Sequence, residues 1–230
     1  MNNGLRKPTS SIRWLAWFLG CAVSAIVVAS DELPYYDSAD FTPVWLDADD
    51  SRLESMHSIA PFSLTDQHGD TVSDETTQGR LYVVSFFFSS CPGICPTLKS
   101  QLSRVQDRFR GDERLLILSH SIRPSNDTPE VLRAYATRNS IDSPNWHLLT
   151  GPRDVIYRLA KTSYFADEDL GEASSLERFL HTENLLLIDT QRRIRGVYNG
   201  LSDASVRYLI DDIELLLSQQ VGASLLANEH

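Results

Sequence analysis

The segment SFFFSSCPGICPTLKSQL at 85–102 contains two cysteines. They stand between a run of apolar residues and a stretch whose apolar residues recur at helical spacing. The run at 81–88 is apolar or nearly so throughout, which is typical of a strand buried on both faces. Proline disfavours the helical conformation in the residue before it, and it is well tolerated in a helix's first turn. We therefore expect Cys91 to Cys95 on an irregular loop, with a helix starting near Pro96. Apolar residues follow at helical spacing, at Leu98, Leu102, Val105 and Phe109.

This spacing sets the chemistry that the thiols can perform. Two thiols four positions apart can form a disulfide, act as a redox couple or hold a soft metal ion. Cys95 is expected at a helix N-terminus, where the dipole and free N–H groups favour a thiolate. A plain structural disulfide needs neither the prolines nor a helix start. Structural zinc commonly takes four ligands, and the sequence shows no second Cys/His pair.

Length and charge narrow the classes of protein. The chain has 230 residues, which suits one domain with an ample core once a short N-terminal segment is set aside. Its formal net charge of −10 argues against nucleic acid or an anionic membrane surface as the main partner. Three cysteines are too few for a disulfide scaffold.

The N-terminus has the charge asymmetry of a targeting segment. Residues 1–13 carry three basic side chains and no acid, and 14–29 are uncharged and mostly apolar. Three outcomes are open: an uncleaved membrane anchor, a signal cleaved near the small residues 28–30, or lipid attachment at Cys21. Each places the following domain on the periplasmic or extracytoplasmic side, and cleavage would release a secreted soluble form.

The rest of the chain divides into a tether, a domain and a tail. After the segment 1–30, we expect an acidic tether at 31–57 that packs partly on the domain through its aromatic residues. The folded domain is expected at 58–222 and a short tail at 223–230. The tether's aromatic residues are Tyr35, Phe41 and Trp45.

Strand and helix patterns alternate through the domain. This alternation predicts an α/β fold, a mixed central sheet flanked by helices. Strands are expected within 61–72 (a hairpin turning at His68-Gly69-Asp70), 81–88, 114–122, 145–151 and 183–200. Helices are expected within 96–109, 127–139, 154–165 and 202–220.

Sheet logic also makes one histidine a candidate neighbour of the cysteines. Loops that follow the carboxyl ends of parallel strands share one edge of a sheet. Cys91 follows one buried strand and His120 follows another, although a structural role for His120 is the favoured interpretation. Asp127 or Thr128 is expected to cap the helix that begins near Pro129, with a place at the edge of the site also open for Asp127.

Five segments follow one another between roughly Pro61 and Leu217: FSLTDQHGDTV, VVSFFFSSCPGICPTL, PSNDTPEVLRAYA, WHLLTG and FLHTENLLLIDTQRRIRGVYNG. Their order resembles the Sco/SenC family of thioredoxin-like copper proteins. The resemblance implies a thioredoxin-like fold and one copper ion, Cu(I) or Cu(II), held by Cys91, Cys95 and His181. Sequence patterning alone would not choose His181 over His120.

The resemblance also implies a function. A family member of this kind acts as a copper metallochaperone for the binuclear copper centre of cytochrome c oxidase. The implied partner is the copper-centre subunit of that oxidase, with other periplasmic copper carriers as further candidates. The alternative is a thiol–disulfide oxidoreductase that keeps the cysteines of that centre reduced, with Cys91 and Cys95 as its catalytic pair. Three intervening residues, in place of the two in thioredoxin-type pairs, favour metal binding, so reductase activity would be secondary.

Two positions depart from the family pattern. An acidic residue is frequent between the two cysteines, and here Pro92, Gly93 and Ile94 stand there. Arg123 occupies a place where an Asp is frequent. Neither change removes an implied ligand, so we expect effects on metal affinity, on the thiol potential or on partner choice.

Overall fold

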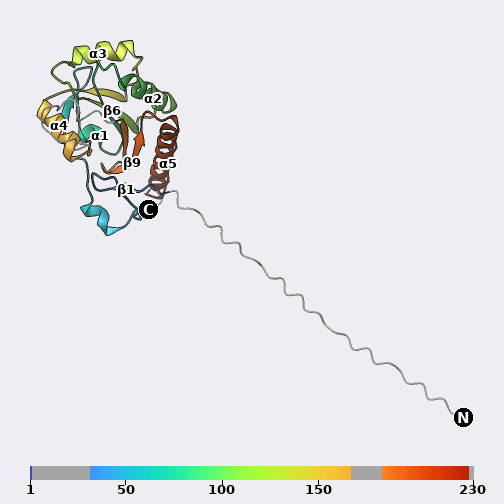
Figure 1. Ribbon diagram of the computed structural model, residues 1–230. Coiled ribbons are helices and arrows are strands. Elements are labelled where there is room, and N and C mark those ends of the chain that lie inside the picture. Colours follow the sequence, from blue (N-terminus) through green and yellow to red (C-terminus); the bar gives the residue numbers. More distant parts are fainter. Residues whose placement is uncertain (2–31, 167–182, 228–230) are drawn as a thin grey trace. The chain divides into compact units, whose positions relative to one another are not determined.

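A computed structural model describes residues 1, 32–166 and 183–227 of the chain. A mixed seven-stranded sheet lies at its centre, in the order β2-β1-β9-β8-β5-β6-β7 (Figure 1). Its strands are β1 (Tyr35–Tyr36), β2 (Pro43–Val44), β5 (Leu81–Phe87), β6 (Leu115–Ser121), β7 (Trp146–Leu149), β8 (Asn184–Ile188) and β9 (Ile194–Asn199). A separate hairpin joins β3 (Ser63–Thr65) to β4 (Thr71–Ser73). The helices are α1 (Asp74–Thr77), α2 (Cys95–Arg108), α3 (Pro129–Arg138), α4 (Arg153–Thr162) and α5 (Asp203–Ala227), with a 3-10 turn at Ser51–Ser55. The predicted mixed sheet with flanking helices is confirmed.

The apolar run ahead of the cysteines forms the central strand β5. All seven of its residues are buried, because β6 pairs with it in parallel on one side and β8 antiparallel on the other. β7 continues the parallel part beyond β6. The pairing of β5 with β6 ends at Phe87 opposite Ser121. The segments that follow the two strands therefore leave the sheet at the same edge. The sequence that follows β5 carries the two cysteines.

Two hydrophobic layers cover the two faces of the sheet. Side chains alternate along a strand, so Leu81 and Val83 face one layer while Tyr82 and Val84 face the other. The first layer contains the apolar faces of α2, α3 and α5. The second contains α4 and the β3–β4 hairpin. Figure 1 shows α2 and α5 neighbouring each other on one side of the sheet and α4 on the opposite side.

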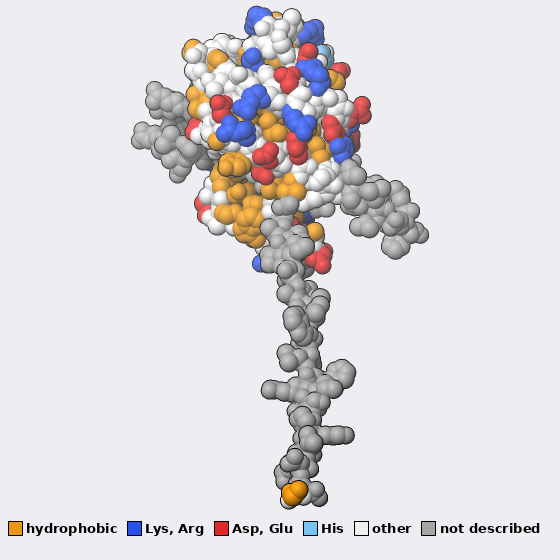
Figure 2. Space-filling model, turned by 90° about the vertical axis from the view of Figure 1, so that its right-hand side faces the viewer, with side chains coloured by type: hydrophobic (Ala, Val, Ile, Leu, Met, Phe, Trp, Pro, Cys, Tyr) orange, Lys and Arg blue, Asp and Glu red, His pale blue; other side chains and the backbone are white. Residues whose placement is uncertain are grey.

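Ion pairs cross between α2 and α5 on the outer surface. Arg108 reaches Glu214 at 2.5 Å, and Arg104 reaches Asp203 at 3.3 Å. Figure 2 views this side of the molecule, where basic and acidic side chains are interspersed. All four side chains are well exposed, so each pair contributes at most about 1 kcal/mol.

Part of the predicted tether is built into the sheet. β1 pairs with β9, and Tyr35 is buried beneath the guanidinium of Arg195, 3.9 Å from its ring centroid. Trp45, which was also expected to pack on the domain, keeps 64% of its surface exposed. Phe41 packs on the second hydrophobic cluster of the domain, with its ring centroid 6.2 Å from that of Phe165. The expectation of packing therefore holds for Tyr35 and Phe41 and is wrong for Trp45. Among the residues that the structure describes, no helix has the length and apolar character to span a bilayer. The predicted anchor at 14–29 lies outside them.

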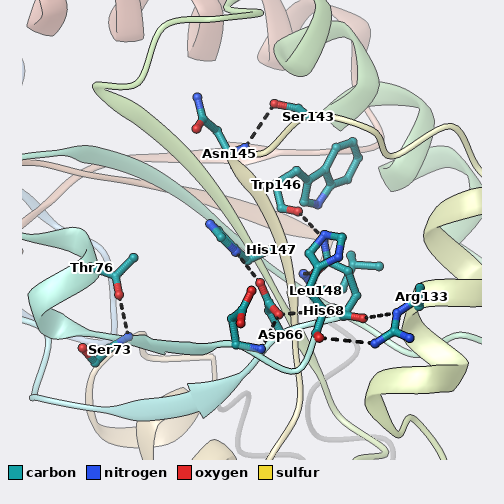
Figure 3. Close-up of polar contacts among 12 residues, drawn as sticks. Asp66, His68, Ser73, Thr76, Arg133, Ser143, Asn145, Trp146, His147 and Leu148 are labelled. Atoms are coloured by element: carbon teal, nitrogen blue, oxygen red, sulfur yellow. Dashed lines mark hydrogen bonds and ion pairs between the residues drawn. The ribbon is translucent and has the colours of Figure 1, made fainter.

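The β3–β4 hairpin is tied to β7 by polar side chains (Figure 3). The Asp66 carboxylate accepts from the amides of His68 and Asp70 and lies 2.9 Å from Nδ1 of His147 in β7. Gly69 supplies the turn with a φ of +90°, a conformation that L side chains rarely adopt. The Gln67 side chain makes two hydrogen bonds with the backbone of β7. Its amide group donates to the Trp146 carbonyl at 2.8 Å, and its oxygen accepts from the Leu148 amide at 2.7 Å. The predicted hairpin is confirmed, and these bonds fix it over the sheet.

His120 lies within β6 and is fully buried in the second layer. Its ring centroid is 5.4 Å from those of Phe86 and Tyr164 and 6.3 Å from that of Phe62. Neither ring nitrogen meets a hydrogen-bond partner among the described residues. Burial lowers the pKa of His120 to about 4, against a smaller opposing effect of nearby backbone groups. The imidazole is therefore neutral at pH 7.

This burial predicts acid sensitivity. The unfolded chain takes up a proton at His120 near pH 6.5, whereas the folded chain resists it until about pH 4. Stability from this group is thus complete above pH 6.5 and is lost as the pH falls toward 4, by about 2 kcal/mol at pH 5. We expect His120→Phe to remove this loss. The measurement is the free energy of unfolding by denaturant at pH 7 and pH 5 for both proteins, and equal pH slopes would contradict the prediction.

Candidate functional site

The two cysteines stand on the loop between β5 and α2. The chain leaves β5 at Phe87 and turns at once, with the Cys91 amide donating to the Phe88 carbonyl at 3.1 Å. α2 begins at Cys95, and Pro96 is its second residue, where a missing N–H costs nothing. The predicted irregular loop followed by a helix is confirmed. Both thiols are free.

The two thiols differ in exposure and influence each other's ionisation. Cys91 is half-buried, whereas Cys95 keeps only 4% of its surface exposed. Burial, and then the interaction with Cys91, raises the pKa of Cys95 to about 12. The expectation that the helix N-terminus favours a thiolate at Cys95 is therefore wrong, because burial outweighs the dipole. Cys95 must therefore lose this proton when it reacts, either to a metal cation that takes its place or as a bond to another sulfur forms.

The wall behind Cys95 is mostly apolar. A cavity of about 20 Å³, enough for one water molecule, lies between α2 and the sheet. Cys95, Leu98 and Tyr135 are among the side chains that line it. Because Cys91 is the more exposed of the two, we expect a ligand or partner to approach the pair from its side.

Asp127 lies under the cysteine loop and does not cap α3. The cap is Thr128, whose hydroxyl accepts from the Val131 amide at 3.4 Å. The buried Asp127 carboxylate instead accepts bonds from Ser89 and Ser121. Sequence reasoning left both residues open as the cap, and nothing in the spacing signals the bond to Ser89.

The two candidate histidines are not equally described. His120 sits in the layer that contains α4, whereas Cys95 belongs to the opposite layer and Cys91 borders both, so the sheet separates His120 from Cys95. His181 lies outside the described residues. Within the described ranges, no three His, Cys, Asp or Glu side chains are grouped to hold a metal ion. The described part thus contains two of the three predicted ligands.

Arg123 lies beside the cysteine loop. Its guanidinium is 4.3 Å from the ring centroid of Phe88, the first residue of the turn that ends at Cys91. A cation over an aromatic face is attracted by the ring's quadrupole. The basic group that departs from the expected Asp therefore packs on the turn itself.

Comparison with known proteins gives consistent matches. The SCO1 protein homolog of Bacillus subtilis is 26% identical over 69% of this chain and 82% of its own length. The structure of BsSco is described as having a disulfide switch and as a member of the Sco family of cytochrome c oxidase assembly proteins. It superposes with a TM-score of 0.59 at 25% identity, covering 69% of this chain and 92% of that one.

A structure of ScoI from Bradyrhizobium japonicum, with copper bound, superposes with a TM-score of 0.54 at 23% identity, over 70% of this chain and 99% of that one. These superpositions confirm the predicted thioredoxin-like fold. The family model described as SCO1/SenC matches residues 50–218, which include both cysteines, the hairpin and most of α5. This chain belongs to the SCO1/SenC family.

Proposed function

We propose that this chain binds one copper ion through Cys91, Cys95 and His181 and helps to assemble the binuclear copper centre of cytochrome c oxidase. The observation that carries the proposal is the pair of free thiols at the β5–α2 junction, one half-buried and one buried. Family membership supports it, as do the copper-bound ScoI structure and the description of BsSco as a member of an oxidase assembly family.

The donor set suits copper. Cu(I) is soft and accepts low coordination, so two sulfurs and one imidazole satisfy it, and Cu(II) tolerates the same ligands. The ion would replace the proton that burial holds on Cys95. Because Cys91 is the more exposed sulfur, an acceptor's thiolate would attack the ion from that side. Copper would then pass by ligand exchange, with Cys95 released last.

A second candidate function is thiol–disulfide exchange. The Cys91 thiolate would attack a partner's disulfide, and Cys95 would resolve the mixed disulfide, leaving the partner as two thiols and this pair as a disulfide. The disulfide switch described for BsSco favours this chemistry in a relative. Such exchange requires no histidine. The two functions therefore separate at His181.

The proposed location follows from the N-terminal charge pattern. We infer that residues 14–29 anchor the chain in a membrane, with the copper-binding domain on the periplasmic or extracytoplasmic side. The copper-centre subunit of the oxidase is the proposed partner, a proposal supported by the description of BsSco as a member of an oxidase assembly family.

The ligand assignment predicts a sharp difference between the two histidines. Cys91→Ser, Cys95→Ser and His181→Ala should each weaken copper binding by more than about a hundredfold, because each removes a direct ligand. His120→Phe should leave binding within about twofold, because His120 packs in the other layer. The measurements are copper content and the visible thiolate-to-Cu(II) absorption. Loss of the site in His120→Phe with retention in His181→Ala would show that the wrong histidine is assigned.

Delivery of copper distinguishes the two candidate functions. A carrier needs the imidazole to hold the ion during transfer, whereas a reductase needs only the thiols. We expect His181→Ala to abolish copper delivery to a reduced, copper-free binuclear copper domain, while Cys91 and Cys95 still cycle between dithiol and disulfide. The readout is growth of the acceptor's copper spectrum, with free copper ions as the control. If the variant and free copper both support assembly as well as the wild type, the protein is a reductase.

Membrane attachment is expected to depend on residues 14–29. The full-length chain should stay with the membrane fraction after alkaline washing, because an apolar span is held by the hydrophobic effect. Recovery of a soluble protein that starts near Ser30 would instead show a cleaved signal. Incorporation of labelled palmitate that Cys21→Ser abolishes would show a lipid anchor.

A further inference from the structure

The turn that leads to Cys91 rests on a buried carboxylate. Asp127 keeps 1% of its surface exposed, and its oxygens accept three hydrogen bonds from two serines. The Ser89 amide donates at 3.1 Å, and the Ser89 hydroxyl donates to the other oxygen. The Ser121 hydroxyl donates as well. Ser89 is the second residue of the turn from Phe88 to Cys91, so Asp127 holds that turn by its backbone and its side chain.

These bonds connect three elements at the edge of the sheet. Ser121 is the last residue of β6, and Asp127 stands two residues before α3. The Ser121 hydroxyl also accepts a hydrogen bond from the Arg123 amide at 3.1 Å. This bond holds the start of the loop that connects β6 to α3. The β5 side is fixed up to Phe87, whose carbonyl accepts from the Ile122 amide at 2.9 Å. Beyond Phe87, Asp127 ties the departing loop to β6 and α3.

A tyrosine places this carboxylate in the neighbourhood of the thiols. Tyr135, on α3, lines the same small cavity as Cys95 and packs in the same hydrophobic layer. α3 begins two residues after Asp127. The helix that carries Tyr135 therefore connects the Asp127 carboxylate to the wall behind Cys95.

We propose that Asp127 is a positioning residue for the thiol pair: through Ser89, its buried carboxylate fixes the turn that presents Cys91 to Cys95. This inference rests on the proposed function, because it takes the pair to be the working group. A role as helix cap does not account for the residue, since Thr128 caps α3. Its three bonds serve the loop before Cys91 and the end of β6.

The proposal has a physical consequence for both kinds of chemistry. A disulfide forms only within narrow limits of distance and torsion, and a shared copper ion likewise needs both sulfurs on the same side. When the turn is fixed in the folded protein, less conformational entropy is lost as the Cys91 sulfur meets the Cys95 sulfur. A loosened turn lowers the effective concentration of one sulfur at the other, so the disulfide and the copper complex should weaken together.

The test compares three variants of the full chain. Asp127→Ala removes all three bonds. Asp127→Asn keeps the shape and removes the charge, since its oxygen can accept from Ser89 and Ser121 while its amide donates to the Ser89 hydroxyl. Thr128→Ala removes the cap of the same helix and leaves the Ser89 turn untouched. The readouts are the dithiol–disulfide equilibrium against glutathione and Cu(I) affinity by competition with a chelator.

We expect Asp127→Ala to make the disulfide about tenfold easier to reduce, which is about 30 mV for this two-electron couple. Cu(I) affinity should fall by a similar factor. Asp127→Asn and Thr128→Ala should both stay within about twofold of wild type. If Asp127→Ala behaves like Thr128→Ala, or if Asp127→Asn is as damaging as Asp127→Ala, the positioning role is wrong.

A substitute variant and a copper-free readout complete the test. Where Asp127→Ala yields no folded protein, Ser89→Ala takes its place, because it removes one of the three bonds from the turn's side. A shift of about threefold in the glutathione equilibrium then supports the proposal, and no shift overturns it. The glutathione equilibrium needs no copper. A wild-type chain that binds no copper would therefore end the proposed function while still testing Asp127.

Discussion

The parallel pairing of β5 with β6 is the constraint on which the site depends. Because the two strands end in register at Phe87 and Ser121, the segments that follow β5 and β6 leave the sheet side by side. The Asp127 carboxylate can then bridge the two exits through Ser89 and Ser121. The cysteines are carried by a loop, yet the rigid centre of the sheet sets where that loop begins, and α2 sets where it ends.

Burial governs the chemistry of the pair. A helix N-terminus lowers the pKa of an exposed thiol, but Cys95 is enclosed by the layer that contains α2, α3 and α5. Desolvation of the thiolate is the larger effect, so the proton stays on Cys95 until something replaces it. Because Cys95 stays protonated, the pair is expected to react slowly in the absence of a metal ion. A soft cation would meet the half-buried Cys91 first. The same asymmetry would assign the attacking role to Cys91 in thiol–disulfide exchange.

Local pattern predicted most of the fold, and long-range packing decided what it could not. The apolar run of β5, the Gly69 turn and Pro96 at the start of α2 each follow from rules that act within a few residues. The pairing of β1 with β9 joins residues far apart in sequence. Local pattern cannot reveal such pairing, so it predicted only a tether at 31–57. The bond from Asp127 to Ser89 spans 38 positions, and the burial of Cys95 depends on three separate helices. His120 was a candidate because its strand ends at the right edge, but strand alternation turns its side chain to the other face.

In the proposed copper site, the two thiols of the β5–α2 loop and an imidazole hold the ion. X-ray absorption at the copper edge, on the full chain loaded with one equivalent of copper, counts the sulfur and nitrogen neighbours of the ion directly. We expect two sulfur ligands and one nitrogen ligand of imidazole type. A spectrum with one sulfur or none, or with oxygen and nitrogen ligands only, would contradict it.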